Sequence, residues 1–170
     1  MDKLKVLSVY GYTGSGKTST IELIIRELVH RGYSVGSVKE IHYEQFAIDT
    51  LGSNTDRHRR AGAELVTARG INETDVLFPN RLSIEQILSF YSQDYVVLEG
   101  VRDTKVPKIL CAKNREEIIK LIDETVFAIS GVISNEISSY NNLPVINSLD
   151  NVKDMVDLIH KKVKDYYRYI

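Results

Sequence analysis

The chain has 170 residues, of which 22 are Lys or Arg and 23 are Asp or Glu. This length predicts a single domain spanning residues 1–170, and the balanced charge predicts neither a nucleic-acid nor a membrane-surface partner. The only cysteine, Cys111, excludes an internal disulfide, and its apolar neighbours predict a buried side chain rather than a nucleophile. We expect a cytoplasmic protein, because the sequence has neither a secretory apolar segment near its start nor a membrane-length apolar run.

Residues 11–18 match the phosphate-loop pattern GxxxxGK followed by Ser or Thr at every required position. Glycines let the backbone curl so that successive N–H groups point at a phosphate, the Lys17 side chain reaches the β- and γ-phosphates, and the Thr18 hydroxyl ligates Mg²⁺. The loop therefore predicts binding of a nucleoside triphosphate. The predicted nucleotide contacts in this stretch are Gly11, Tyr12, Thr13, Gly14, Ser15, Gly16, Lys17, Thr18 and Ser19.

The elements around this loop have the order that phosphate binding requires. An apolar run from Leu4 to Tyr10 predicts a buried parallel strand before the loop. After the loop, apolar residues at helical spacing from Ile21 to Val29 predict a helix, and Gly32 is placed to end it. The N-terminus of this helix adds partial positive charge beneath the phosphates.

A second strand is predicted over Tyr33–Lys39, and it brings Lys39, Glu40 and His42 to the strand end beside the loop. Residues 43–55 have no clean period and contain turn-forming residues, so we expect a mobile loop that carries Asp49. Asp49 either holds a Mg²⁺-bound water or is an ordinary loop carboxylate.

A compact basic cluster, Asp56-Arg57-His58-Arg59-Arg60-Ala61-Gly62-Ala63, follows in an otherwise neutral chain. It suits either a phosphate-like ligand or a solvated helix end. A metal site at His42 or His58 is not expected, because neither has a His or Cys at ligand spacing.

The remaining chain continues to alternate strands and helices. This alternation predicts an α/β fold with a three-layer, mostly parallel sheet flanked by helices. The predicted strands and extended pieces are Glu64–Ala68, Asp75–Phe78, Asp94–Gly100, Lys108–Ala112, Val126–Ile129 and Leu143–Ile146, the last two as parallel core strands. The predicted helices follow a capping box at Ser83 and Gln86 until about Gln93, follow Asn114, and begin at Asp150.

The strand Asp94–Gly100 carries a second chemical signal, because it is apolar and ends in Glu99. An acid at the end of such a strand, after a phosphate loop, contacts Mg²⁺ directly or through water, or orients the attacking water. Glu99 is therefore the predicted catalytic residue, and Thr18 and Glu99 are the predicted metal contacts. Gly100 allows the ligand to approach the backbone closely.

These residues together resemble the adapter family of molybdopterin-guanine dinucleotide biosynthesis, MobB. The resemblance rests on four stretches and extends from the first strand to about residue 112, with looser similarity in the last helix. The stretches are Gly11–Thr18; Val38-Lys39; Asp49–Gly52 leading into Arg57-His58 and Ala61-Gly62-Ala63; and Leu98-Glu99-Gly100 followed by Pro107-Lys108-Ile109.

The resemblance implies GTP and Mg²⁺ as ligands, at most weak GTP hydrolysis, and a homodimer. It also implies a guanylyltransferase partner that attaches GMP to molybdopterin, and Asp49 and Arg57 as a second ligand-contacting surface where a molybdopterin-type cofactor is possible. The chain departs from the family pattern at Glu40, where a His is usual, and at Asn54, within a stretch where Lys-Asp is usual.

Two other functions share the phosphate loop. A small-molecule kinase would use Arg57, Arg59 and Arg60 as a lid, but the sequence shows no acceptor pocket or base. A metal-delivering GTPase would carry Cys or His pairs, which this chain lacks. The guanine-reading pattern NKxD is also absent, since Asn147-Ser148-Leu149-Asp150 lacks the Lys and predicts a turn, so the choice of GTP over ATP rests on the resemblance alone.

Overall fold

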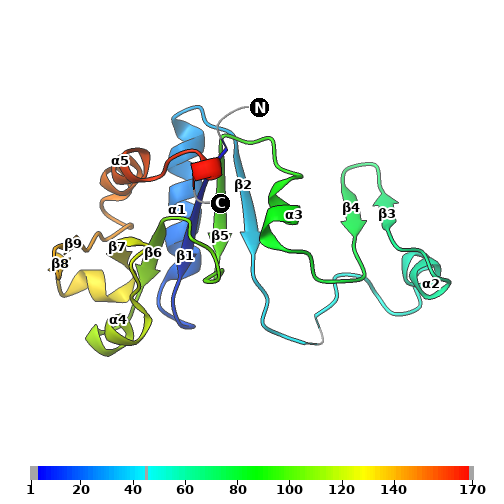
Figure 1. Ribbon diagram of the computed structural model, residues 1–170, viewed down its shortest axis with the longest axis horizontal. Coiled ribbons are helices and arrows are strands. Elements are labelled where there is room, and N and C mark those ends of the chain that lie inside the picture. Colours follow the sequence, from blue (N-terminus) through cyan, green and yellow to red (C-terminus); the bar gives the residue numbers. More distant parts are fainter. Residues whose placement is uncertain (1–3, 45, 169–170) are drawn as a thin grey trace. The chain divides into compact units, whose positions relative to one another are not determined.

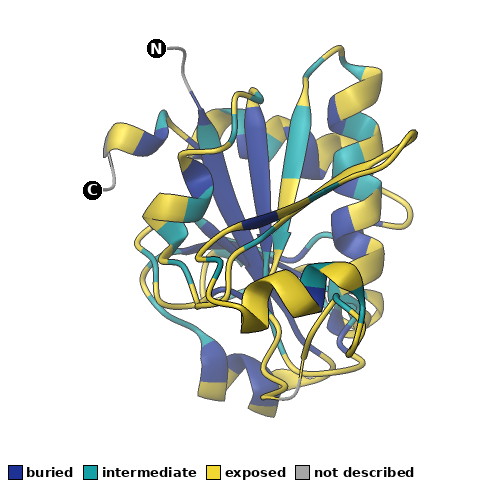
Figure 2. Ribbon diagram, turned by 90° about the vertical axis from the view of Figure 1, so that its right-hand side faces the viewer, coloured by how far each residue is buried: buried dark blue, intermediate teal, exposed yellow. Residues whose placement is uncertain are grey.

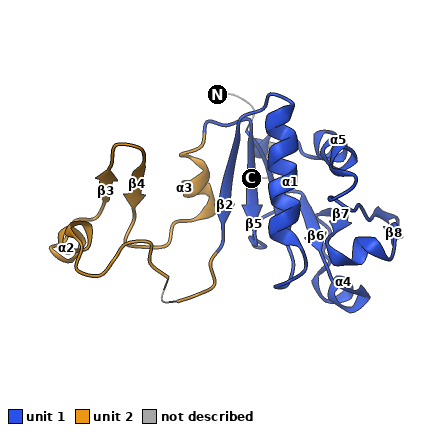
Figure 3. Ribbon diagram, turned by 180° about the vertical axis from the view of Figure 1, so that it is seen from behind, with its two compact units in different colours: residues 1–40, 92–170 blue, residues 41–91 orange. Residues whose placement is uncertain are grey.

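The computed structural model describes residues 4–44 and 46–168. The chain divides into two compact units, residues 1–40 with 92–170 and residues 41–91 (Figure 3). The expectation of a single domain stays a prediction.

The larger unit is built on a five-stranded parallel sheet with the order β2-β5-β1-β6-β7 (Figure 1). Its strands are β1 (Lys5–Tyr10), β2 (Val35–Lys39), β5 (Tyr95–Glu99), β6 (Lys108–Cys111) and β7 (Val126–Ser130). Its helices are α1 (Lys17–His30), α4 (Arg115–Leu121) and α5 (Val152–Lys162), with 3₁₀ turns η1 (Val132–Asn135) and η2 (Tyr166–Arg168). The predicted α/β class is confirmed.

Two apolar clusters place the helices on the two faces of the sheet. Buried residues of α1 and α5, such as Ile24 and Met155, pack with Leu7 and Ile109 of the central strands. Ile118 of α4 packs with Leu110 and other residues that face the opposite way. Because successive side chains of a strand point to opposite faces, the central strands are buried on both sides (Figure 2).

The predicted parallel core strand Leu143–Ile146 is wrong in extent, because only its end lies parallel to β7. The strand β9 covers only Leu143–Pro144 and pairs antiparallel with β8 (Ser139–Tyr140). Two residues with positive φ, Asn141 and Asn142, make the tight turn that joins them. Val145 alone forms a parallel bridge to β7, at Ile129, because Pro144 has no N–H to extend a ladder.

The second unit, residues 41–91, contains α2 (Asn54–Arg60), β3 (Val66–Arg69), β4 (Thr74–Leu77) and α3 (Ile84–Leu88). The two strands form an antiparallel ribbon that is separate from the parallel sheet. The predicted capping box at Ser83 and Gln86 is confirmed, although α3 ends at Leu88 instead of Gln93.

Candidate functional site

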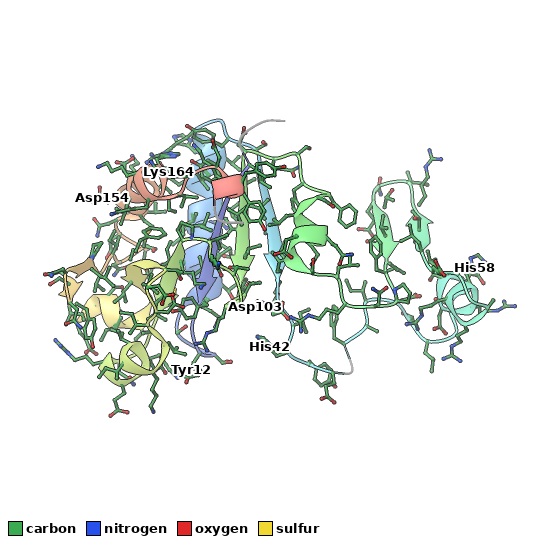
Figure 4. All side chains as sticks on the ribbon, in the orientation of Figure 1. Tyr12, His42, His58, Asp103, Asp154 and Lys164 are labelled. Carbon is green, nitrogen blue, oxygen red and sulfur yellow. The ribbon has the colours of Figure 1, made fainter. Side chains whose placement is uncertain are left out.

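The phosphate loop connects β1 to α1, as predicted, and its glycines adopt backbone conformations that other residues rarely reach. Gly11 has φ 152°, and a Cβ at this position would lie 2.0 Å from the carbonyl oxygen of Cys111. The loop is therefore packed directly against the end of β6. Tyr12 lies at the outer end of the loop (Figure 4), with 46% of its surface exposed.

The Lys17 ammonium group reaches back across the loop, where its Nζ donates a hydrogen bond to the carbonyl oxygen of Tyr12 at 2.8 Å. This contact places a positive charge over the curled backbone. Ser15 lies beneath it and is fully buried, and its hydroxyl oxygen has no hydrogen-bond partner among the described residues. Buried hydroxyl groups are nearly always bonded, so this one is expected to bond to a water molecule or to a polar ligand atom.

Strand pairing brings three side chains together beside the loop. Lys39 and Glu99 are register partners on β2 and β5, and Lys39 Nζ lies 2.7 Å from Glu99 Oε1. The same carboxylate oxygen accepts a hydrogen bond from the hydroxyl of Thr18 in the first turn of α1, at 3.2 Å. The predicted metal contacts Thr18 and Glu99 are thus adjacent.

These oxygens fit the chemistry of Mg²⁺, which prefers hydroxyl, carboxylate, phosphate and water oxygens. The described residues hold no cluster of three or more His, Cys, Asp or Glu that suits a metal ion. Two protein oxygens leave most of an octahedral shell to phosphate and water. The residues present therefore suit a metal that arrives with a nucleotide.

Two other predicted contacts lie close to this centre. Gly100, with φ 80°, follows β5 directly, and its N–H donates to the carbonyl of Val9 at 2.9 Å. Ser19, in the first turn of α1, lines a cavity of about 140 Å³ together with residues that follow β7.

Sequence reasoning missed two parts of this arrangement. The sequence places Lys39 at the correct strand end but does not assign it to the site. Its register position opposite Glu99 is the feature that could have identified it. The turn after β7 was missed entirely: the Val132 N–H donates to the carbonyl of Ser15 at 3.2 Å, and a Cβ on Gly131 would lie 2.1 Å from that same oxygen. No local pattern reveals such a contact, because it joins residues more than a hundred positions apart.

Asp49 lies in the second unit, where it organises the turn that leads into α2. Its Oδ1 accepts hydrogen bonds from the backbone N–H of Thr50 and from the hydroxyls of Ser53 and Thr55, at 2.8–2.9 Å. These bonds, the Ser53 hydroxyl first, lower the pKa of the Asp49 carboxyl. Its Oδ2 is buried without a partner in the described part of the chain.

The basic cluster lies on α2, where it surrounds a buried acid. The side chain of Asp56 is only 1% exposed and forms ion pairs with Arg59 at 2.7 Å and Arg60 at 3.0 Å. The N–H of Gly52 and these guanidinium groups lower the pKa of Asp56 to about 2. Two of the three arginines thus have an internal partner, and the third, Arg57, is exposed. His58, the next residue of α2, is also exposed (Figure 4).

Two further predictions concern single residues and the whole chain. Cys111 is buried as expected, and burial raises the pKa of its thiol to about 12. Within the described ranges, every helix is too short or too polar to cross a membrane.

Comparison with known proteins identifies a family and several relatives that the chain resembles. The sequence model of the family described as MobB, Molybdopterin guanine dinucleotide synthesis protein B, matches residues 6–135. A putative molybdopterin-guanine dinucleotide biosynthesis adapter protein of Methanocaldococcus jannaschii is 28% identical over 166 residues, which cover 94% of this chain but only 62% of that relative. The corresponding adapter protein of Haemophilus influenzae is 28% identical over 164 residues, covering 92% of this chain and 89% of the relative.

Solved structures show the same fold. MobB of Bacillus subtilis matches with a TM-score of 0.75 at 23% identity, covering 94% of this chain and 98% of that chain. A MobB homologue of Bacillus stearothermophilus matches with a TM-score of 0.69 at 21% identity, covering 92% and 96%. With the family model spanning most of the sequence, the chain belongs to the MobB family.

Proposed function

We propose that this chain is a GTP-binding adapter that assists the guanylyltransferase in forming molybdopterin guanine dinucleotide, with at most weak Mg²⁺-dependent GTP hydrolysis. One observation carries the nucleotide part of the proposal: a phosphate loop with Lys17 lies beside the Thr18–Glu99 pair. The pathway and the adapter role come from the names of the relatives, which are adapter proteins of this biosynthesis.

Each residue of the site has a defined task in this proposal. The loop amides and Lys17 hold the phosphates, and the unpaired hydroxyl of Ser15 gains a phosphate oxygen. Thr18 and Glu99 would hold Mg²⁺, which neutralises phosphate charge when it is bound. Glu99 is then placed to orient water, and Lys39 must exchange its contact with Glu99 for solvent or phosphate.

A second ligand surface is proposed on the unit of residues 41–91, at Asp49 and Arg57. The buried free oxygen of Asp49 and the exposed guanidinium of Arg57 are polar groups that a molybdopterin-type cofactor could engage. The rigid turn at Asp49 supports this reading, because three hydrogen bonds fix its carboxylate in place.

We also propose a homodimer formed through residues 41–91. This unit buries few large apolar side chains, namely Val66 and Leu88, and exposes many more. A two-stranded ribbon is marginally stable by itself, and β3–β4 is paired with no further strand among the described residues. A second copy would cover this surface. The exposed residues are Ile41, Tyr43, Phe46, Ile48, Leu51, Leu65, Ile71, Val76, Phe78 and Phe90.

Calorimetric titration with GTP and with ATP, both with Mg²⁺, tests the nucleotide site. The Lys17→Ala variant should bind GTP at least about tenfold more weakly, because it loses the charge at the phosphates. The matched control is Lys120→Ala, which removes an exposed charge from α4. Unchanged GTP affinity in Lys17→Ala contradicts the site, and ATP binding as tight as GTP binding favours the kinase reading.

The adapter part needs a separate measurement. Added protein should increase the yield of molybdopterin guanine dinucleotide from a purified MobB-dependent guanylyltransferase, and Lys17→Ala should reduce that increase. No change in yield at saturating protein and GTP contradicts the adapter role while leaving nucleotide binding intact.

A further inference from the structure

A cavity lies beside the phosphate loop, and most of the residues that line it are not part of the phosphate site. It has a volume of about 140 Å³, lies in the larger unit, and is bounded by the first turns of α1, the turn after β7 and the segment before α5. Sites that enclose a whole drug-sized ligand measure about 300–1,000 Å³. This cavity is therefore suited to one ring system rather than a complete nucleotide.

The position of the cavity follows from the order of the strands. Thr18 faces Glu99 on β5, which lies on one side of β1. Ser19, the next residue of α1, lines the cavity, which adjoins β7 on the other side of β1. The cavity and the Thr18–Glu99 pair therefore lie on opposite sides of β1, with the first turn of α1 bordering both.

Two exposed aliphatic side chains lie among the residues that line the cavity. Val132 and Leu149 line it from two different segments, with 44% and 71% of their surfaces exposed. Aliphatic side chains in such positions provide faces against which a planar ring can pack. The floor contains Ser130 and Ser148, whose hydroxyls bond to each other at 2.9 Å, so they are already satisfied.

Two asparagines at the rim have fixed amide orientations. The Nδ2 of Asn135 donates to the Val132 carbonyl at 3.1 Å, and the Oδ1 of Asn147 accepts from the Leu149 N–H at 3.0 Å. The two amides are also joined, with Asn147 Nδ2 donating to Asn135 Oδ1 at 3.0 Å. Among the described residues, the side-chain NH₂ group of each asparagine donates one hydrogen bond, and its second N–H remains available to donate to a ligand.

We propose that this cavity is the base subsite of the nucleotide site and that Asn135 and Asn147 read the carbonyl of a 6-oxopurine. Guanine and hypoxanthine present the O6 and N7 acceptors to these N–H donors, whereas adenine presents an amino group at position 6. The residues that line the cavity include neither an acidic nor a basic side chain. No lining carboxylate is therefore available to read the 2-amino group that distinguishes guanine from hypoxanthine. The inference rests on the proposed nucleotide-binding function.

Competition titrations with GTP, ITP, ATP and tripolyphosphate, each with Mg²⁺, test this assignment. ITP carries hypoxanthine, so GTP and ITP should bind within about threefold of each other, and ATP should bind at least about tenfold more weakly. GTP binding that is tenfold tighter than ITP binding overturns the proposal, as does equal binding of GTP and ATP.

Variants separate the base subsite from the phosphate site. Asn135→Ala should reduce the preference for GTP over ATP to less than about threefold while leaving tripolyphosphate binding unchanged. The control Asn151→Ala lies outside the cavity and makes no side-chain cap hydrogen bond to α5, so it should keep the preference. An unchanged preference in Asn135→Ala overturns the subsite. If the wild-type protein binds tripolyphosphate and Lys17→Ala abolishes that binding, the result supports the phosphate site but not the base subsite. If the wild-type protein does not bind tripolyphosphate, the result overturns both the proposed function and this inference.

Discussion

Lys39 and Glu99 lie opposite each other on neighbouring parallel strands, and their ion pair uses the same carboxylate oxygen that accepts the hydrogen bond from Thr18. A metal ion bound at Thr18 and Glu99 must therefore compete with the Lys39 ammonium group. Lys39 is 59% exposed in its side chain and Glu99 is 15% exposed, so the lysine can leave more easily than the carboxylate.

The first prediction concerns this competition. Lys39→Ala should lower the Mg²⁺ concentration needed for half-maximal GTP binding by about two- to fivefold, the range expected for loss of a partly exposed ion pair. Glu99→Gln should raise that concentration and reduce any GTP hydrolysis. Magnesium titrations of GTP binding measure both. Lys113→Ala, which breaks the ion pair between Lys113, just before α4, and Glu117 on α4, is the matched control. A higher magnesium requirement in Lys39→Ala contradicts the competition.

The second prediction concerns Gly131, whose φ of 85° nearly equals the 88° of Gly32. A Cβ at Gly32 meets nothing within 4 Å, whereas one at Gly131 collides with the Ser15 carbonyl. Gly32→Ala should therefore lower the free energy of unfolding by about 1 kcal/mol through backbone strain alone. Gly131→Ala should cost about 1–3 kcal/mol more, because its ψ of −158° places it in a region that essentially only glycine adopts and because the added Cβ forces the loop to move. Chemical denaturation measures both, and equal costs would show that the turn does not constrain the loop.

The third prediction separates ligand binding from folding at Ser15. Because its buried hydroxyl has no partner among the described residues, Ser15→Ala should leave the free energy of unfolding of the ligand-free protein unchanged or raise it by about 1 kcal/mol. The same variant should weaken GTP binding about tenfold. Ser8→Ala is the control, since the Ser8 hydroxyl donates to the buried Val101 carbonyl at 2.6 Å and its loss should destabilise the fold. Destabilisation by Ser15→Ala would contradict the assignment.

Most of the larger unit could be predicted from the sequence, because its strands are continuous apolar runs and its first helix has a clear period. Leu7 and Val9 are buried in the run that the pattern identified. The last core strand could not be predicted, since its apolar residues resemble those of β7. The positive φ of Asn141 and Asn142 turns the chain into a hairpin there. Asparagine favours this conformation, but it also occurs in ordinary loops, so the pair alone does not identify the hairpin.

The candidate site was predictable where one short motif contains it and less so where distant segments meet. Residues 11–18 are recognisable alone, and the position of Glu99 at a strand end adds the second signal. The contact of Val132 with Ser15 depends on β6 lying between β1 and β7, which local pattern does not encode. For the same reason the pattern does not predict the cavity that Asn135 and Asn147 line.

The fourth prediction is a pH dependence within residues 41–91. The pKa of Asp56 falls from 3.8 to about 2 in the folded state, so its contacts stabilise the start of α2 above roughly pH 4 and are lost as the pH falls through 2. Amide protection at Gly52, measured by NMR, should follow this window. Asp56→Asn should reduce that protection at pH 7, whereas Asp75→Asn, on the exposed face of β4, should not. Full protection in Asp56→Asn at pH 7 would refute the role of the carboxylate.

The fifth prediction tests the dimer through the ribbon. Val76 on β4 is 51% exposed, and a charged residue there should oppose burial against a second copy. Val76→Glu should therefore shift the protein from dimer to monomer in analytical ultracentrifugation, with at least a tenfold rise in the dissociation constant. Ile119→Glu, at a 66% exposed position of α4, is the matched control and should leave the dimer intact. A dimer that survives Val76→Glu but dissociates in Ile119→Glu would move the interface to the larger unit, and a monomeric wild-type protein at high concentration would exclude the dimer.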